Sequence, residues 1–356
     1  MDPHATLVPM PAPPRPLRRP AAALSPPRLS VVVVNYHQWA DTAALVRQLR
    51  AAPALRRGAA EVVIVDNHSP AHPLVPRLRR LAGVSLRRWR HNRGFARAVN
   101  EGCRLARGEW VLLLNPDMTL DPSFLDKALA RAELLAGAEP SAGILGFGLR
   151  NLDGSRQLSA GPFPTLVGTL ARLALPRSRR KYSLLPGNTC GRVDWVTGCC
   201  LLVRRACWEA LGGLDPDFFL YYEDVDLCRR ARERGWGVWY EPGLTAVHHH
   251  PLHARSVPAH LRVITRHALL TYARKHWSAW KLGALARVIR AEAWVRGARA
   301  CWRGDAEAAG LFTELGRIAA DLARGRARPA GRRLQRLVRL REERRAAAAD
   351  RHHPQP

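Results

Sequence analysis

The sequence contains no CxxC pair and no long apolar run, and these absences exclude several classes of protein. Its 356 residues include seven cysteines, an odd number without the spacing of a zinc site or redox motif. We therefore expect free, mostly buried thiols. No uninterrupted apolar stretch reaches the roughly 18 residues that a membrane-spanning helix needs. The N-terminus has no apolar core of a secretory signal, so we expect a cytoplasmic protein.

Lysine is scarce, and the large positive charge of the chain comes from arginine. Basic residues number 57 against 29 acidic ones, which gives a formal net charge of +28. Such a charge suits either a nucleic-acid-binding protein or attachment to an anionic membrane. No helix-turn-helix, zinc-finger or RNA-recognition signature is present. We therefore expect no nucleic-acid partner and a peripheral position on the inner face of the cell membrane, through the aromatic-bearing stretch 260–302.

Apolar β-branched runs alternate with helical patterns in the first half of the chain. Such runs are typical of strands buried on both faces, and helices between them imply right-handed crossovers between parallel strands. We predict strands at 29–35, 61–66, 84–89 and 110–114, and helices at 41–50 and 95–106. The fold class is therefore α/β, with a mostly parallel sheet that helices cover on both faces.

The second half of the chain is less regular. We predict one strand at 193–203, helices at 204–211 and 225–234, and short strands at 237–241 and 244–247. The domain plan is an N-terminal Pro/Arg-rich tail (1–28), an α/β domain (29–255), a basic helical extension (256–321) and a basic tail (322–356). Within the last segment, residues 332–345 could form a helix.

Acidic residues follow the predicted strands at the positions where ligands bind to open α/β sheets. Asp66 and Asp117 come at strand ends, and Asp117 offers an oxygen ligand for Mg²⁺ or Mn²⁺. Such an ion would neutralise a diphosphate leaving group. Glu223 and Asp224 follow an aromatic cluster that could desolvate Asp224 and raise its pKa toward that of a general base. Any one of these residues alone could be a turn former or helix cap.

Six segments, in the correct order over about residues 29–250, carry a resemblance to a known family. They are SVVVVNY (30–36), VVIVDNHS (62–69), NRGFARAVNEG (92–102), WVLLLNPD (110–117), VTGCCLLVRR (196–205) and GGLDPDFFLYYEDVDLCRRARERGW (212–236). The chain resembles the family 2 glycosyltransferases of the GT-A fold, and among them the rhamnosyltransferase-like and galactofuranosyltransferase-like branch.

The resemblance implies an inverting, non-processive glycosyltransferase of cell-surface polysaccharide synthesis. Its partners would be a nucleotide-diphosphate sugar, of the dTDP-rhamnose or UDP-hexose type, and a hydroxyl of a glycan or lipid-linked acceptor. Residues 29–117 would form the nucleotide-binding half and residues 118–255 the acceptor half. The matching donor-binding residues, with Asp66 as the nucleobase contact, are Asn35, Asp66, Asn67, Asn92, Gly94, Asn100 and Asn115.

The same resemblance assigns the catalytic and metal-binding residues. Asp224 matches the base that deprotonates the acceptor hydroxyl, and Glu223 is its acceptor-side neighbour. Asp117 matches the last carboxylate of the DxD-like metal motif, whose first position here is Asn115. His248 matches a histidine, late in the chain, that binds the metal or the diphosphate in some relatives. Because three histidines are consecutive, His249 and His250 stay open as alternatives for that role.

Two other functions use similar chemistry. Nucleotidyltransferases also combine a nucleotide-binding α/β domain with acidic metal ligands, but they usually begin with a glycine- and arginine-rich loop after the first strand, which Asn35, Tyr36 and His37 do not provide. A nucleic-acid-binding protein remains the alternative from another class, and its binding would weaken steeply with salt. Processive synthases carry a QxxRW motif, which is absent.

Overall fold

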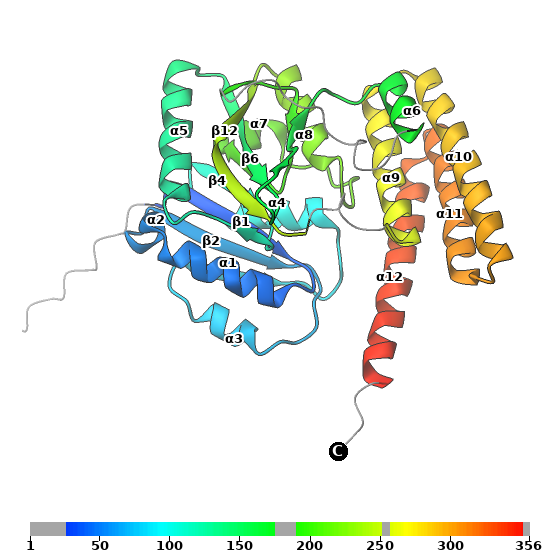
Figure 1. Cartoon of the computed structure of the whole chain (residues 1–356), viewed down its shortest axis with the longest axis horizontal. Coiled ribbons are helices and arrows are strands. Elements are labelled where there is room, and N and C mark those ends of the chain that lie inside the picture. Colours follow the sequence, from blue (N-terminus) through cyan, green and yellow to red (C-terminus); the bar gives the residue numbers. More distant parts are fainter. Residues whose placement is uncertain (1–25, 175–189, 251–256, 352–356) are drawn as a thin grey trace, which may run out of the picture.

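The computed structural model describes residues 26–174, 190–250 and 257–351. The predicted N-terminal tail therefore lies almost wholly outside the described residues. An α/β domain with a ten-stranded sheet is followed by four long helices that stand beside it (Figure 1). The main path of the sheet runs β3-β2-β1-β4-β11-β6-β12-β5, with β7 and β9 at its margins.

The first half of the sheet is parallel, as predicted. Its strands are β1 (Leu29–Asn35), β2 (Ala60–Asp66), β3 (Val84–Arg88) and β4 (Trp110–Leu114). The helices between them are α1 (Trp39–Ala51), α2 (Pro53–Arg56), α3 (Leu74–Arg79) and α4 (Phe95–Leu105). In the register of β1 and β2, Asn35 lies opposite Asp66, so the carboxyl ends of the two strands meet at one edge.

The second half makes the sheet mixed, because β11 runs antiparallel between β4 and β6. Its strands are β5 (Met118–Thr119), β6 (Ala142–Arg150), β7 (Arg156–Gln157), β9 (Gly191–Arg192), β11 (Cys200–Arg204) and β12 (Gly237–His248). Strands β8 (Ala160–Gly161) and β10 (Trp195–Val196) pair with each other in a separate two-stranded sheet. Its helices are α5 (Phe124–Ala138), α6 (Leu166–Ala174), α7 (Arg205–Leu211) and α8 (Glu223–Glu233). Strand β6 and helix α5 were not predicted.

Two strand predictions in this half are wrong: one predicted strand is divided, and two predicted strands are one. The strand expected at 193–203 is divided into β10, which pairs with β8 in the two-stranded sheet, and β11, which lies in the main sheet. Between them, the backbone N–H of Gly198 donates to Asp224. The two short strands expected at 237–241 and 244–247 are one strand, β12, whose pairing with β6 shifts in register between Glu241 and Thr245. A bulge in one strand, rather than a turn, explains the turn formers there.

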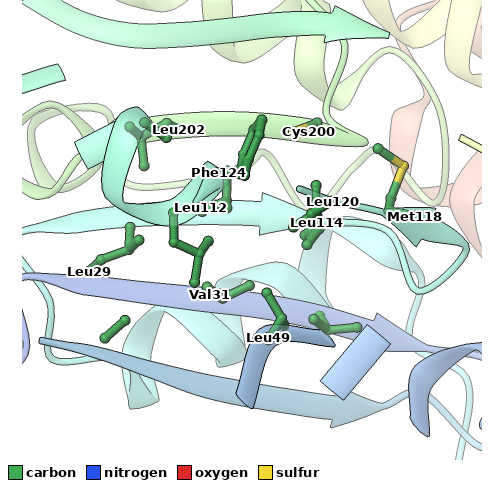
Figure 2. Close-up of a cluster of buried hydrophobic side chains, with 14 of the residues drawn as sticks. Leu29, Val31, Leu49, Leu112, Leu114, Met118, Leu120, Phe124, Cys200 and Leu202 are labelled. Atoms are coloured by element: carbon green, nitrogen blue, oxygen red, sulfur yellow. The ribbon is translucent and has the colours of Figure 1, made fainter. Parts of the chain in front are cut away.

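Each face of the sheet has its own apolar core. Along β1, Val31 and Val33 pack into a cluster with α1 and α5, whereas Val32 and Val34 pack into a second cluster with α4 and α8. Figure 2 shows the first cluster, in which Phe124 of α5 lies against the strands. Both faces of β1 are thus covered, which explains why its sequence is apolar without interruption.

The four C-terminal helices form a bundle with a third apolar core. They are α9 (Ala259–His276), α10 (Ala279–Trp302), α11 (Ala306–Ala323) and α12 (Ala327–Arg351). The segment from residue 322, predicted as a basic tail in which residues 332–345 could form a helix, contains helix α12. This helix buries Ala330 and Leu334 in the core of the bundle, with Leu337 and Val338 packed beside them. Their spacing is that of one helix face, which the high arginine content obscured.

The state of the cysteines and the character of the helices can be compared with the sequence analysis, which expected mostly buried thiols and no membrane-spanning helix. All seven cysteines are free, five of them are buried, Cys190 is half-buried and Cys301 is exposed. In the described ranges, none of the helices combines the length and apolar character that crossing a bilayer requires.

The buried carboxylate of Asp226 connects the α/β domain to the bundle. Asp226 lies on α8 and is fully buried, and it pairs with Arg230 of its own helix and with Lys275 and His276 of α9, at N–O distances of 2.7 to 2.8 Å. Burial alone would raise the pKa of Asp226, but the hydrogen bond from His276 and the two basic neighbours lower it to about 2. The carboxylate is therefore ionised and shared by two helices.

We predict that Asp226→Asn lowers the free energy of unfolding by about 3 kcal/mol, because it removes one partner of a buried ion cluster. The folded-state pKa lies below the ordinary value of 3.8, so this contribution is complete above that pH and disappears as the pH falls toward 2. Urea denaturation across this pH range would measure both effects. The control is Glu233→Gln in an exposed pair of the same helix, with an expected change of about 0.5 kcal/mol or less. Equal losses in the two variants would contradict the prediction.

Candidate functional site

A cavity of about 1050 Å³ lies where the ends of β1 and β4 face the helical bundle. Its α/β wall includes Asn67, Asn92, Asn115, Asp117, Glu223, Asp224 and His248, seven of the predicted site residues. Its bundle wall comes from α9, α11 and α12 and mixes leucines with arginines. The structure thus brings the predicted metal-binding and catalytic carboxylates to one cavity.

Asp117 and His248 are neighbours because the short strand β5 pairs antiparallel with the end of β12. Both are buried, and the Nε2 atom of His248 lies 3.5 Å from Oδ1 of Asp117. Burial would raise the pKa of Asp117, but His248 and, less strongly, His250 hold it below its ordinary value. The side chain of His249 instead pairs with Thr119. Of the three consecutive histidines, His248 is therefore the one paired with the carboxylate, and His250 also lines the cavity.

The donor set at Asp117 fits a metal ion that is completed by a substrate. Over the described ranges, no group of three or more His, Cys, Asp and Glu side chains is arranged to hold an ion by itself. Asp117 and His248 supply two potential ligands at the cavity wall. Mg²⁺ is commonly held by one or two carboxylates together with substrate phosphates and water. Asp117 supplies such a carboxylate, so the residues present fit such an ion.

Glu223 and Asp224 open helix α8 at the cavity. The two residues before them, Tyr221 and Tyr222, have φ values of 75° and 67°, which bulky side chains rarely adopt and which turn the chain sharply into the helix. The Oδ2 atom of Asp224 accepts from the N–H of Gly198 at 2.9 Å, and its Oδ1 accepts from the N–H of Val225 at 2.9 Å. Two backbone donors thus fix the orientation of this half-buried carboxylate.

Asn35 and Asp66, predicted as donor contacts, lie behind the cavity wall. Both are fully buried. Asp66 accepts from the amide of Asn35 at 2.7 Å and from Nε of Arg88 at 2.9 Å. Asn67, the next residue, does line the cavity, and its amide donates to Asn92 at 2.8 Å. Asp66 therefore anchors the loop that carries Asn67, a donor-site candidate that lines the cavity.

Gly94 and Asn100 also lie outside the cavity lining, for reasons that the sequence did not reveal. Gly94 has a φ of 88°, and a Cβ there would lie 2.8 Å from the carbonyl oxygen of Phe219, which also accepts from the N–H of Phe95. The close approach predicted for a phosphate is thus made by the backbone of Phe219. The amide of Asn100 is paired on both atoms with the backbone of Leu214, at 2.8 and 2.9 Å.

Helix α12 contributes residues to the site that were not predicted. Glu342 accepts hydrogen bonds from the hydroxyl of Tyr36 at 3.0 Å and from the amide of Asn92 at 2.9 Å. Burial and this carboxylate raise the pKa of Tyr36 to about 12. Arg341 and Arg345 line the same cavity. The apolar stripe of α12 was the available signal, because it predicts a packed helix rather than a tail.

Comparison with known proteins identifies the family to which the chain belongs. The family model described as "Glycosyltransferase like family 2" matches residues 26–271. The N-acetylglucosaminyl-diphospho-decaprenol L-rhamnosyltransferase of Mycobacterium tuberculosis is 31% identical over 241 residues, which cover 62% of this chain and 76% of the relative. The low-salt glycan biosynthesis hexosyltransferase Agl10 of Haloferax volcanii is 27% identical over 244 residues, 63% of this chain and 68% of the relative.

A solved structure shows a similar fold. The crystal structure of GalNAc-T7 with UDP, GalNAc and Mn²⁺ superposes with a TM-score of 0.50 and 16% identity, over 68% of this chain and 47% of that one. The predicted α/β fold of the GT-A type with a C-terminal helical region is therefore confirmed, although the sheet is mixed beyond its first four strands. From the family model, the relatives and the fold together, the chain belongs to glycosyltransferase family 2 and is a glycosyltransferase.

Proposed function

We propose that the chain is an inverting, non-processive transferase that moves a sugar from a nucleotide diphosphate of the dTDP-rhamnose or UDP-hexose type to a hydroxyl of a glycan or lipid-linked acceptor, in the synthesis of a cell-surface polysaccharide. The observation that carries the proposal is that Asp117 with His248, and Glu223 with Asp224, line one cavity. The names of the two relatives support a rhamnosyl or hexosyl donor and a diphospho-lipid acceptor.

The donor side is assigned to the wall built by the ends of β1, β2 and β4. Asp117 and His248 would hold Mg²⁺ or Mn²⁺, which would offset the negative charge that develops on the departing diphosphate. Asn115 offers its amide group to the nucleotide from the same wall. Asn67 and Asn92 line that wall too, with their amides paired to each other and to Glu342. The predicted roles of Asn35, Asp66, Gly94 and Asn100 become supporting ones in this proposal, because each is held by protein groups behind that wall.

The acceptor side is assigned to the start of α8. A hydroxyl is a poor nucleophile until its proton is being removed, and a positioned carboxylate is suited to this task. Asp224 has a fixed orientation through Gly198 and Val225 and is less buried than Glu223, which favours it as the base. Attack from the acceptor side, opposite the diphosphate, would invert the anomeric carbon.

The bundle wall suits an acceptor with both apolar and anionic parts. Leu311, Leu337 and Val338 offer an apolar surface inside the cavity, and Arg336 and Arg341 lie among them on α12. A lipid diphosphate combines these two chemistries. This arrangement supports a lipid-linked acceptor over a free sugar.

Asp224→Asn preserves the shape of the side chain and removes the base, so we expect turnover to fall by about 10²–10⁴-fold with little change in donor affinity. A screen of nucleotide sugars, followed by transfer assays with the active donor, would measure this. Asp153→Asn, in an exposed loop outside the cavity, is the matched control. Normal turnover of Asp224→Asn together with loss in Glu223→Gln would assign the base to Glu223 instead.

Asp117→Ala should abolish transfer and weaken donor binding, because it removes the carboxylate of the proposed metal site. EDTA should have the same effect on the unchanged protein, and Mg²⁺ or Mn²⁺ should restore activity. Calorimetric titration of the nucleoside diphosphate with and without the ion would separate binding from turnover. Transfer that survives both the substitution and EDTA would refute the metal role.

We further propose that helix α10 attaches the enzyme to the anionic inner face of the cell membrane. Trp280, Trp294 and Trp302 are 66%, 75% and 86% exposed. Their spacings of about four and about two helical turns place them near one side of the helix. Tryptophan favours the membrane–water interface, and basic side chains near an anionic surface add about 1 kcal/mol each.

We expect the protein to co-sediment with anionic vesicles, and the bound fraction to fall as salt screens the charges. Trp294→Ala combined with Trp302→Ala should reduce binding at low salt, whereas Leu134→Ala, an equally exposed apolar residue on α5, should not. Equal binding to neutral vesicles, or binding that salt leaves unchanged, would count against attachment by this helix.

A further inference from the structure

A second, smaller pocket lies between α4, α9 and α12, outside the proposed catalytic machinery. Its volume is about 210 Å³, and Phe219 lines both this pocket and the larger cavity. Three of its lining residues, His267, Thr271 and Arg274, follow one another at helical spacing on α9. They therefore face the pocket from one side of that helix.

These three residues carry buried polar atoms that the protein does not satisfy. His267 and Thr271 are 2% and 1% exposed. In the part of the chain that the structure describes, Nδ1 of His267, Oγ1 of Thr271 and Nε of Arg274 have no hydrogen-bond partner. Buried polar atoms are nearly always hydrogen-bonded, and leaving one unpaired is costly. Three such atoms around one pocket indicate that a ligand supplies their partners.

The charge around the pocket indicates an anion. Exposed arginines surround it from two other elements: Arg93 and Arg97 at the start of α4, and Arg328 and Arg332 on α12. The one carboxylate in the described lining is that of Asp217, which already pairs with Arg274 at 3.0 Å. Guanidinium groups so close together repel one another, and a bound anion would remove this repulsion.

The size and the directions of the donors indicate which anion. The pocket is smaller than the roughly 300–1,000 Å³ of ordinary small-molecule sites, so it suits a head group rather than a whole nucleotide sugar. Donors approach from three elements, and the oxygens of a tetrahedral group point in more directions than the two coplanar oxygens of a carboxylate, which favours the tetrahedral group. Arginine also binds phosphate oxygens through paired, charge-assisted hydrogen bonds. Burial lowers the pKa of His267 to about 4, so its imidazole is neutral and donates from one ring nitrogen.

We propose that this pocket is a binding site for a phosphate or diphosphate group, held by Thr271, His267 and Arg274 and enclosed by the arginines of α4 and α12. The group could belong to a lipid head group or to a soluble phosphate, and the recognition chemistry is the same. Because its contacts come from the α/β domain and from two helices of the bundle, its binding would stabilise α12 against the catalytic domain.

The test uses the full chain and three probes: inorganic phosphate, pyrophosphate, and phosphatidylcholine vesicles with or without phosphatidic acid. Titration calorimetry and co-sedimentation would compare the unchanged protein with Thr271→Val and Arg332→Gln. We expect the affinity of each variant for the probe to be lower by a factor of about ten. Arg339→Gln is the matched control, since it removes the same charge from the same helix but lines neither cavity, and it should bind normally.

The outcomes separate the sources of the phosphate and can refute the site. Saturable binding of phosphate or pyrophosphate that both variants weaken would identify a soluble anion. Binding confined to phosphatidic acid vesicles, and weakened by the same variants, would identify a lipid head group. Circular dichroism and melting temperature would show whether Thr271→Val folds, and Arg332→Gln on the exposed rim gives an independent reading. Absence of binding to all three probes, or equal binding by the variants and the control, would overturn the proposal.

Discussion

The ion cluster at Asp226 is the constraint on which the arrangement of the two halves depends. Asp226 lies two residues after Asp224, and successive residues of a helix point about 100° apart. Asp224 can therefore face the cavity while Asp226 faces Lys275 and His276 of α9. A buried ion pair contributes little net stability compared with apolar packing, but it tolerates few alternative arrangements. The start of α8 and the end of α9 are fixed by the same carboxylate.

The two pockets follow from that arrangement and differ in how their polar groups are satisfied. Behind the larger cavity, Asp66 has partners in Asn35 and Arg88, so it supports the wall without needing a ligand. In the smaller pocket between α4, α9 and α12, Oγ1 of Thr271 and Nδ1 of His267 are also buried but have no hydrogen-bond partner within the described chain. The first pattern is that of a scaffold and the second that of a binding site.

The sequence predicted the features that depend on local patterns. Strands β1 and β4 were placed to the residue, because runs buried on both faces are apolar throughout. Helix α4 and the carboxylates at strand ends followed in the same way, since hydrophobic period and turn formers are local signals. The grouping of Asp117 with Glu223 and Asp224 came from the family resemblance, and all three line one cavity.

The features that were missed depend on contacts between distant residues. Gly94 is needed for the approach of Phe219, and Asn100 is held by Leu214, both more than a hundred positions away. Between β10 and β11, the backbone N–H of Gly198 donates to the carboxylate of Asp224 on α8, a contact between distant segments. For α12, the arginines dominated the composition, although Leu334, Leu337 and Val338 had the spacing of a packed helix. For Gly94, Asn100 and Gly198, a local sequence pattern cannot show which distant residue will be the contact partner.

The contact between Tyr36 and Glu342 has a consequence for how the enzyme is made. The two residues are 306 positions apart, so a ribosome adding about 5–20 residues per second synthesises them on the order of tens of seconds apart. During that interval the parallel strands of the first half are already available for pairing, but the α12 part of the cavity wall does not yet exist. The edge of the sheet at which β1 and β2 end therefore lacks this cover on the nascent chain and gains it only when α12 has been synthesised.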